Sequence, residues 1–146
     1  MKISEIMTKD VYTIRPDATL KQCAEAMKRH DVNNLVVMDG QTVAGVITKT
    51  DIFKSILPSY ADIIEDERHL ESFEYIEGRV HKLYDLTVRD LMSAPAITIS
   101  GDMPIVRAGS LMILRRIKQL PVADNGRLMG IITFTNIINH FLEKVK

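Results

Sequence analysis

The sequence repeats itself with a shift of 85 residues, and this repeat restricts the possible fold more than any other feature. When the chain is slid by that distance, Ile6-Met7-Thr8 falls on Leu91-Met92-Ser93, and Gly45-Val46-Ile47-Thr48 falls on Gly130-Ile131-Ile132-Thr133. Turn residues and apolar residues also coincide between these ends, and no gap is needed. A duplication of this kind indicates two copies of one supersecondary unit that pack on each other.

Each copy predicts the order strand, helix, strand, strand, helix. Apolar residues at Leu20, Cys23, Ala24 and Met27 follow the spacing of an amphipathic helix, and Asp39-Gly40 is a pair typical of hairpin turns. The elements expected in the first copy are a strand at 11–14, a helix from Leu20, strands at 35–38 and 43–48, and a helix at 50–57. The sequence therefore predicts an α/β fold, in the α+β sense, built twice.

The chain divides into three parts on this interpretation: a first repeat at 1–57, an inter-repeat segment at 58–86 and a second repeat at 87–146. The middle segment is not rich in Gly and Ser as a flexible linker is, and it carries apolar residues at spacings near three and four among many acidic ones. We expect it to be helical, packed on the module or on a partner subunit, with a switch element as the alternative.

Composition excludes several function classes. Nineteen basic residues balance nineteen acidic ones, so overall charge favours neither nucleic acid nor a membrane surface. No apolar run is long enough to cross a bilayer, the start of the chain does not resemble a signal peptide, and the single cysteine fits a reducing compartment, so we expect a cytoplasmic protein. The four histidines lack metal-ligand spacing and the usual catalytic signatures are absent, so we expect neither a metal site nor an enzyme.

Three marks, each present in both copies, resemble the CBS domain family, named after cystathionine β-synthase. The marks of the first copy are Ile6-Met7-Thr8, Asn33-Asn34-Leu35-Val36-Val37 and Gly45-Val46-Ile47-Thr48-Lys49-Thr50-Asp51. The marks of the second are Leu91-Met92-Ser93, Lys118-Gln119-Leu120-Pro121-Val122 and Gly130-Ile131-Ile132-Thr133-Phe134-Thr135-Asn136. The resemblance covers nearly the whole chain and implies a stand-alone pair of repeats related by a pseudo-twofold axis, with two clefts between them. Such clefts imply a ligand such as AMP, ADP, ATP, S-adenosylmethionine or NAD.

Thr48 and Asp51 are the residues on which a first ligand site most depends. Thr48 ends a strand directly before a helix, where free backbone N–H groups favour a phosphate, and Asp51 offers two oxygens to the hydroxyls of a ribose. The same pair is also a capping box, in which both side chains bond to the backbone and no ligand is needed. The family pattern implies a first site at Asn34, Val46, Thr48, Asp51, Met92, Ser93, Ala96, Ile97, Ile117 and Lys118.

The second cleft departs from the family pattern because Asn136 stands where Asp51 stands in the first copy. An amide has one acceptor oxygen and no charge, so we expect this cleft to bind more weakly or to stay empty. Its implied residues are Met7, Thr8, Val11, Tyr12, Val32, Asn33, Gln119, Ile131, Thr133 and Asn136.

Basic side chains near the expected phosphates are Lys49, Arg115, Arg116 and Lys118, with His30 at the position that matches Arg115. They either bind phosphate, in which case affinity rises from AMP to ATP, or are simply solvated.

The predicted function is a regulatory module that senses an adenosine ligand and acts on an unidentified effector protein. The alternative is a structural or dimerisation module without a ligand. Apolar residues added on the helices of the second copy, together with the family resemblance, favour a homodimer.

Overall fold

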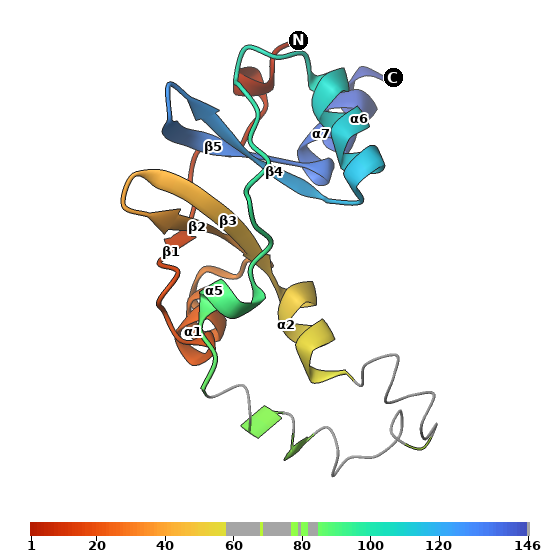
Figure 1. Cartoon of the computed structure of the whole chain (residues 1–146). Helices are drawn as coiled ribbons and strands as arrows, with labels where there is room; N and C mark the ends of the chain where they lie inside the picture. Colours follow the sequence, from red (N-terminus) through yellow and green to blue (C-terminus); the bar gives the residue numbers. More distant parts are fainter. Residues whose placement is uncertain (58–67, 69–76, 79, 82–84, 146) are drawn as a thin grey trace.

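The computed structural model describes residues 1–57, 68, 77–78, 80–81 and 85–145, so most of the inter-repeat segment expected to be helical lies outside the described residues. Two β-sheets lie next to each other in the middle of the molecule, and the helices cover its two ends (Figure 1). The α-helices of the first repeat lie at one end and the long helices of the second repeat at the other, so the duplicated sequence folds as two facing units (Figure 1).

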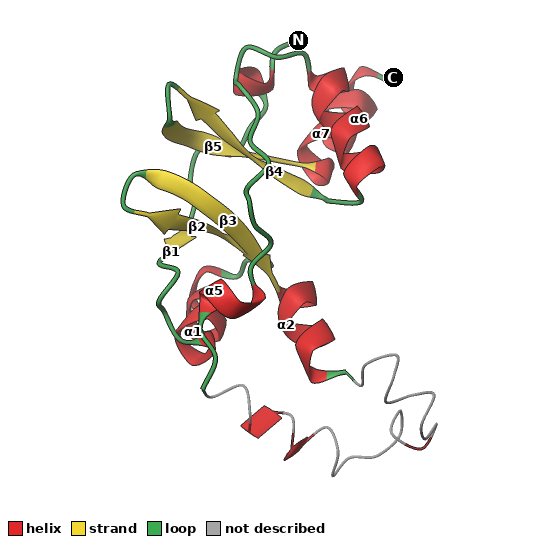
Figure 2. Cartoon of the chain, in the orientation of Figure 1, coloured by secondary structure: helices red, strands yellow, loops and turns green. Residues whose placement is uncertain are grey.

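The first repeat contains the predicted strands and helices with bounds that differ by one or two residues (Figure 2). Its elements are the 3-10 helix η1 (Ile3–Glu5), β1 (Thr13–Ile14), α1 (Leu20–His30), β2 (Asn34–Asp39), β3 (Thr42–Thr48) and α2 (Lys49–Ile56). The sheet order is β1-β2-β3, in which β1 runs parallel to β2 and β2 runs antiparallel to β3.

The second repeat follows the same plan. Its elements are α5 (Val88–Leu91), α6 (Ile105–Arg115), β4 (Gln119–Asp124), β5 (Arg127–Thr133) and α7 (Phe134–Lys144). The pairing of β4 with β5 starts at Gln119 and Thr133, which matches the pairing of Asn34 with Thr48 in the first repeat. The predicted order of elements is therefore confirmed, and the register of the hairpin is duplicated together with the sequence.

One strand of the second copy is reduced to a single bridge. Ile99 pairs with Val122 in parallel, but among the residues that the structure describes no third strand comparable to β1 joins the sheet β4-β5. In the first repeat the Val36 N–H donates to the Tyr12 carbonyl over 3.2 Å. The matching position in the second repeat is Pro121, which has no N–H, and so the equivalent hydrogen bond cannot form.

Two apolar cores hold the molecule together, and each contains a residue from the other repeat. Ile3 is fully buried in the core of the second repeat, and Val88 is fully buried in the core of the first. The Ile3 N–H donates to the Met103 carbonyl and the Val88 N–H donates to the Ala18 carbonyl, both over 2.9 Å. The two contacts between the repeats are therefore equivalent. Burial of such side chains stabilises the fold by about 1.5–3 kcal/mol each, and neither repeat has a complete core without the other.

No helix among the described residues is long and apolar enough to span a bilayer.

Candidate ligand-binding cleft

A cleft of about 510 Å³ lies between the two repeats. Its first wall is the corner where β3 ends and α2 begins, and its second wall comes from the segment after α5 and from the turn between α6 and β4. The residues that line it are Asn33, Val46, Thr48, Lys49, Thr50, Asp51, Lys54, Ser93, Pro95, Ala96, Ile97, Arg116, Ile117, Lys118, Gln119 and Pro121. Both copies of the repeat therefore contribute to one hollow.

The corner between β3 and α2 is fixed by a capping box. The Thr48 N–H donates to Asp51 Oδ2 over 2.9 Å, and the Asp51 N–H donates to Thr48 Oγ1 over 3.1 Å. A box of this kind is worth about 0.5–2 kcal/mol to a helix start. It uses Oδ2 and leaves Oδ1 of the same half-buried carboxylate outside the box, so capping and ligand binding by Asp51 are compatible.

The two walls are joined by backbone hydrogen bonds between Val46 and Ser93. Val46 N–H donates to the Ser93 carbonyl over 3.2 Å, and Ser93 N–H donates back over 2.9 Å. A Cβ at the neighbouring Gly45 would lie 2.5 Å from the Ser93 oxygen, so this approach requires glycine. The width of the cleft is therefore set by main-chain contacts between the repeats.

Most of the residues expected for the first site lie together. Val46, Thr48, Asp51, Ser93, Ala96, Ile97, Ile117 and Lys118 all line the cleft. Asn34, which pairs with Thr48 in the β-ladder, does not line it, and the preceding residue Asn33 lines it instead. Met92 also lies outside the lining and packs against the core of the first repeat.

Several lining residues were not assigned to this cleft from the sequence. Asn33 and Gln119 are expected in the other cleft but line this one. Of the basic residues expected near the phosphates, Lys49, Arg116 and Lys118 line the hollow and Arg115 does not. Lys54 lies three residues after Asp51 on α2, and this helical spacing is a signal that could have identified it. Thr50, Pro95 and Pro121 had no such signal.

The residues expected in the second cleft lie around the corner between β5 and α7. Thr133 and Asn136 form the same capping box as the first corner, with distances of 2.9 and 3.1 Å. Asn136 Nδ2 also donates to Thr8 Oγ1 over 3.4 Å, and the Thr8 backbone pairs with Ile131. The amide group of Asn136 thus takes part in contacts within the protein through both its oxygen and its nitrogen.

The remaining expected residues of the second cleft have different environments. The rings of Tyr12 and His30 stack with their centroids 3.9 Å apart. Met7 packs against the core of the second repeat and Val32 against that of the first, while Val11 is half-buried.

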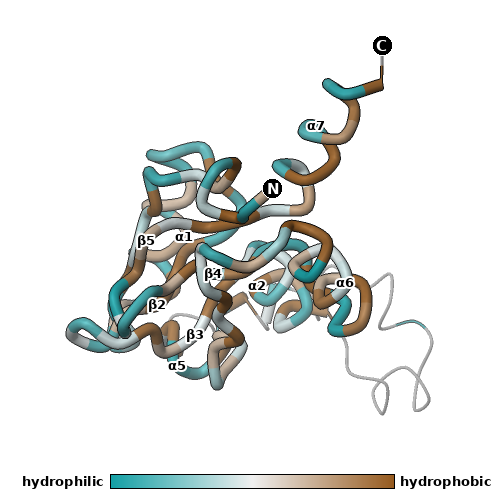
Figure 3. Tube along the Cα trace, turned by 90° about the horizontal axis from the view of Figure 1, so that it is seen from above, coloured by the Kyte–Doolittle hydropathy of each residue, from teal (hydrophilic) through white to brown (hydrophobic). Residues whose placement is uncertain are grey.

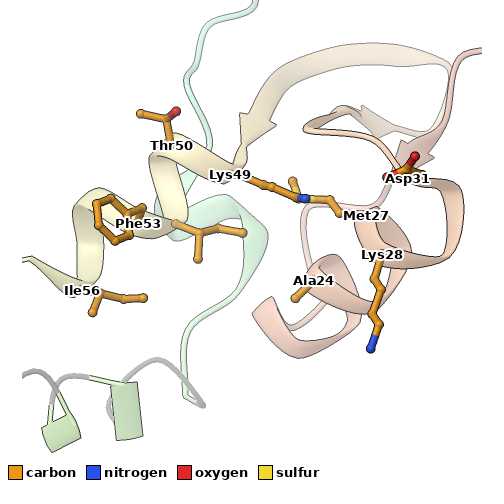
Figure 4. Close-up of a pocket in the computed structure, with 9 residues that line it drawn as sticks. Ala24, Met27, Lys28, Asp31, Lys49, Thr50, Phe53 and Ile56 are labelled. Atoms are coloured by element: carbon orange, nitrogen blue, oxygen red, sulfur yellow. The ribbon is translucent and has the colours of Figure 1, made fainter.

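A separate groove of about 720 Å³ lies on the first repeat between α1 and α2 (Figure 4). Ala24 and Met27 of α1 and Phe53 and Ile56 of α2 supply its apolar lining, and the Lys49 side chain extends toward Met27. The groove is larger than the cleft, but no residue of the second repeat lines it. We therefore place the candidate ligand site in the cleft, where residues of both copies converge.

Neither reactive cysteine chemistry nor a metal cluster is indicated in the described part of the chain. Cys23 is fully buried, and burial raises the pKa of its thiol to about 11. Among the described residues, no group of three or more His, Cys, Asp or Glu side chains is arranged to hold a metal ion.

A pair of β-α-β-β-α units joined across a cleft defines a tandem-repeat module, and comparison with protein families identifies the repeat. The CBS domain model matches residues 3–58 and 88–143. The chain therefore belongs to the CBS domain family and carries two CBS domains in tandem.

Relatives in sequence include proteins of several lengths. The chain is 28% identical over 144 residues to an uncharacterised 17.7 kDa protein of Acidianus ambivalens, and it covers 74% of that protein. It covers 61% of the protein MK0525 of Methanopyrus kandleri at 28% identity, and 89% of the protein MJ1426 of Methanocaldococcus jannaschii at 33% identity. It also matches 23% of the inosine-5′-monophosphate dehydrogenase of the latter organism at 27% identity, so CBS pairs occur as parts of larger enzymes.

Solved structures share the fold over nearly the whole chain. The protein MJ1225 of Methanocaldococcus jannaschii aligns with a TM-score of 0.76 at 26% identity, covering 96% of this chain and 47% of that one. The CBS domain pair of protein MJ0100, solved in complex with 5′-methylthioadenosine and S-adenosyl-L-methionine, aligns with a TM-score of 0.74 at 22% identity, covering 99% and 98% of the two chains. CBSX2, solved in complex with AMP, aligns with a TM-score of 0.74 at 21% identity over the same shares.

Proposed function

We propose that the cleft binds an adenosine nucleotide and that the module acts as a regulatory sensor. The observation that carries this proposal is the placement of Asp51, a half-buried carboxylate at the start of α2, in one hollow with the apolar side chains of Ala96, Ile97 and Ile117 from the other repeat. A nucleoside matches both parts of this hollow, because the diol on its sugar can donate to the carboxylate and its flat base can pack on the apolar side chains.

The ribose contact would come from the carboxylate. Asp51 Oδ1 lies outside the capping box and can accept a hydrogen bond from a sugar hydroxyl, while Oδ2 retains its bond to the Thr48 N–H. Hydrogen bonds to a charged acceptor in a partly buried site are worth about 1.5–3 kcal/mol.

The base would lie against the second repeat. Pro121 cannot donate to the carbonyl of Ile97, whereas the matching Val36 donates to Tyr12 in the first repeat. The Ile97 carbonyl at this wall therefore accepts no hydrogen bond from residue 121, and an amino group on the ligand can donate to it instead. Apolar walls with a few polar groups of this kind are typical of sites for purines.

The ligands of similar structures support this choice of chemistry. The MJ0100 domain pair was solved with 5′-methylthioadenosine and S-adenosyl-L-methionine, and CBSX2 was solved with AMP. These molecules share an adenosine group and differ in what is attached to the sugar.

Regulation would follow from the position of the ligand between the repeats. A ligand that contacts both walls favours the arrangement in which Val46 and Ser93 stay paired. It shifts the equilibrium between arrangements only as far as its affinities for them differ. Because Ile3 and Val88 each complete the other repeat's core, such a shift reaches both ends of the module.

The test is the binding of adenosine ligands by wild type and by Asp51→Asn. Asn136 shows that asparagine builds the same capping box, so the substitution removes the charge without removing the cap. In thermal-shift and calorimetric measurements with AMP, ADP, ATP, S-adenosylmethionine and NAD, at least one ligand should stabilise the wild type, by about 2.7 kcal/mol at about 100 times its Kd. Asp51→Asn should bind that ligand at least about tenfold more weakly. Without ligand, the melting temperature of the variant should equal that of the wild type.

Equal binding by wild type and Asp51→Asn would contradict the assignment of this residue. A lack of response to every ligand in the panel would instead favour a structural or dimerisation module.

We also propose that the module pairs with a second copy of itself through the helices of the second repeat. Exposed apolar side chains continue from α6 onto α7, and in Figure 3 α7 extends away from the body of the molecule with hydrophobic residues along it. These exposed residues are Val106, Ile113, Leu114, Ile138, Phe141, Leu142 and Val145. Positions 106, 113 and 114 match Lys21, Lys28 and Arg29 on α1, which favours contact between two second repeats.

A further inference from the structure

The cleft between the repeats is strongly cationic although the whole chain has no net charge. Among the described residues, its lining includes Lys49, Lys54, Arg116 and Lys118, against a single carboxylate on Asp51. All four cations belong to exposed residues, whereas Asp51 is half-buried. The positive charge therefore lies at the mouth of the cleft, outside the proposed ribose position.

The cations come from two parts of the fold, helix α2 of the first repeat and the turn between α6 and β4 of the second. Lys54 lies on α2, close to one turn beyond Asp51. Arg116 ends α6 in the left-handed conformation, with a φ of 55°, and this turn directs the chain past Lys118 into β4. Lys49 begins α2 but extends toward Met27, so the argument depends mainly on the other three (Figure 4). Convergence of cations from both repeats is not expected of side chains that are merely solvated.

At the positions pseudo-equivalent to these four cations, three residues are uncharged and one is acidic. The shift of 85 residues places Asn139 at the position of Lys54, Asp31 at that of Arg116 and Asn33 at that of Lys118. It also places Phe134 at the position of Lys49 and Asp10 at that of Pro95. The residues pseudo-equivalent to the whole cleft lining therefore include two carboxylates, Asp10 and Asp31. Their one cation is Lys118, which is the equivalent of the lining residue Asn33. The two faces of the module differ in charge although their backbones match.

We infer that the ligand of the Thr48–Asp51 cleft carries a chain of two or three phosphates, and that the pseudo-equivalent face does not accept such a chain. This inference rests on the proposed function and specifies the ligand class of the same site. Each added phosphate brings negative charge to Lys54, Arg116 and Lys118, and the Thr50 N–H at the second position of α2 has no acceptor within its own helix. S-Adenosylmethionine carries a sulfonium cation at the corresponding place and gains nothing from these groups.

The experiment compares adenosine, AMP, ADP, ATP and S-adenosylmethionine by calorimetry, without Mg²⁺ and at two NaCl concentrations. The variants are Lys54→Asn and Lys118→Asn, which install the residues found at the equivalent positions, and Arg116→Asn, because asparagine tolerates the left-handed conformation. Arg127→Gln, on an exposed residue at the start of β5, is the control for loss of a positive charge outside the cleft.

We expect ATP to bind at least about tenfold more tightly than AMP, with a stoichiometry of one per chain. Each of the three variants should weaken ATP binding about three- to tenfold and weaken adenosine binding less, while Arg127→Gln should behave as wild type. Salt should weaken ATP binding more than AMP binding.

Three results would overturn the inference while the proposed function stands: equal affinities for AMP and ATP, unchanged ATP binding in all three variants, or tight binding of two ATP molecules per chain. If no adenosine compound binds at all, the proposed function itself fails.

Discussion

At the scale of single residues, the clearest comparison is between Asp51 and Asn136. Both close a capping box at a strand-to-helix corner with nearly the same distances, so the local structure does not distinguish them. They differ in charge and in partners, because the Asn136 amide donates to Thr8. The two corners therefore differ in one chemical group. The Asp51 carboxylate keeps an oxygen outside the capping box, whereas the Asn136 amide uses both its oxygen and its nitrogen in contacts within the protein.

Cys23 provides a prediction at the same scale. Its buried thiol should not react with a thiol reagent in the folded protein at neutral pH, and it should react once the protein is unfolded in guanidinium. The folded-state pKa of about 11 lies above the ordinary value of 9.0, so the unfolded state loses its proton first as the pH rises. Between these values the free energy of unfolding should fall, by about 2–3 kcal/mol in total.

Cys23→Ala is the matched control, since Ala108 occupies the equivalent buried position of the second repeat. Chemical denaturation across this pH range should show a smaller fall in stability for the variant. An equal fall in both proteins would show that other groups cause it.

At the scale of elements, the junction of β3 with the segment at Ser93 is the contact most sensitive to substitution. In Gly45→Ala the new methyl group would meet the Ser93 carbonyl oxygen at 2.5 Å, and the main chain must move to relieve the overlap. We expect a loss of about 1–3 kcal/mol in the free energy of unfolding and weaker ligand binding, because Val46 and Ser93 line the same cleft. Urea denaturation and calorimetry measure the two effects.

Gly109→Ala is the control for adding a methyl group elsewhere. Its Cβ would lie 3.8 Å from Ile137 Cδ1, an ordinary contact, and alanine favours the helix. This variant should be as stable as the wild type or more so. If Gly45→Ala behaves in the same way, the junction is not tightly packed.

At the scale of the whole molecule, the apolar face of α6 and α7 predicts association. Leu114 is 76% exposed, and its equivalent on α1 is Arg29, so Leu114→Arg introduces a residue that the same helix position tolerates in the first repeat. Light scattering after gel filtration should show a dimer for the wild type and a shift toward monomer for Leu114→Arg, with unchanged helical content by circular dichroism. A charged group in the centre of an apolar interface is costly unless it is paired.

Arg127→Gln, outside the proposed interface, should remain a dimer. A wild-type protein that is monomeric at all accessible concentrations would contradict the proposed pairing.

The sequence alone determined the order of elements and most of one wall of the cleft. Two kinds of signal suffice for these features: the 85-residue repeat, and local spacings such as the helical one from Leu20 to Met27 and the Thr48-to-Asp51 spacing that starts α2. Each depends on residues a few positions apart, or on a comparison between the copies. The family match over both repeats agrees with them.

Tertiary structure alone decided how the repeats complete each other and which polar groups meet. No local pattern indicates that Ile3 fills the second core and Val88 the first, because these burials depend on crossings between distant segments. That Asn33 rather than Asn34 lines the cleft, and that Lys54 and Arg116 line it together, depends on how the two units pack. Such contacts are set by the fit of whole surfaces, which residue spacing along one chain does not encode.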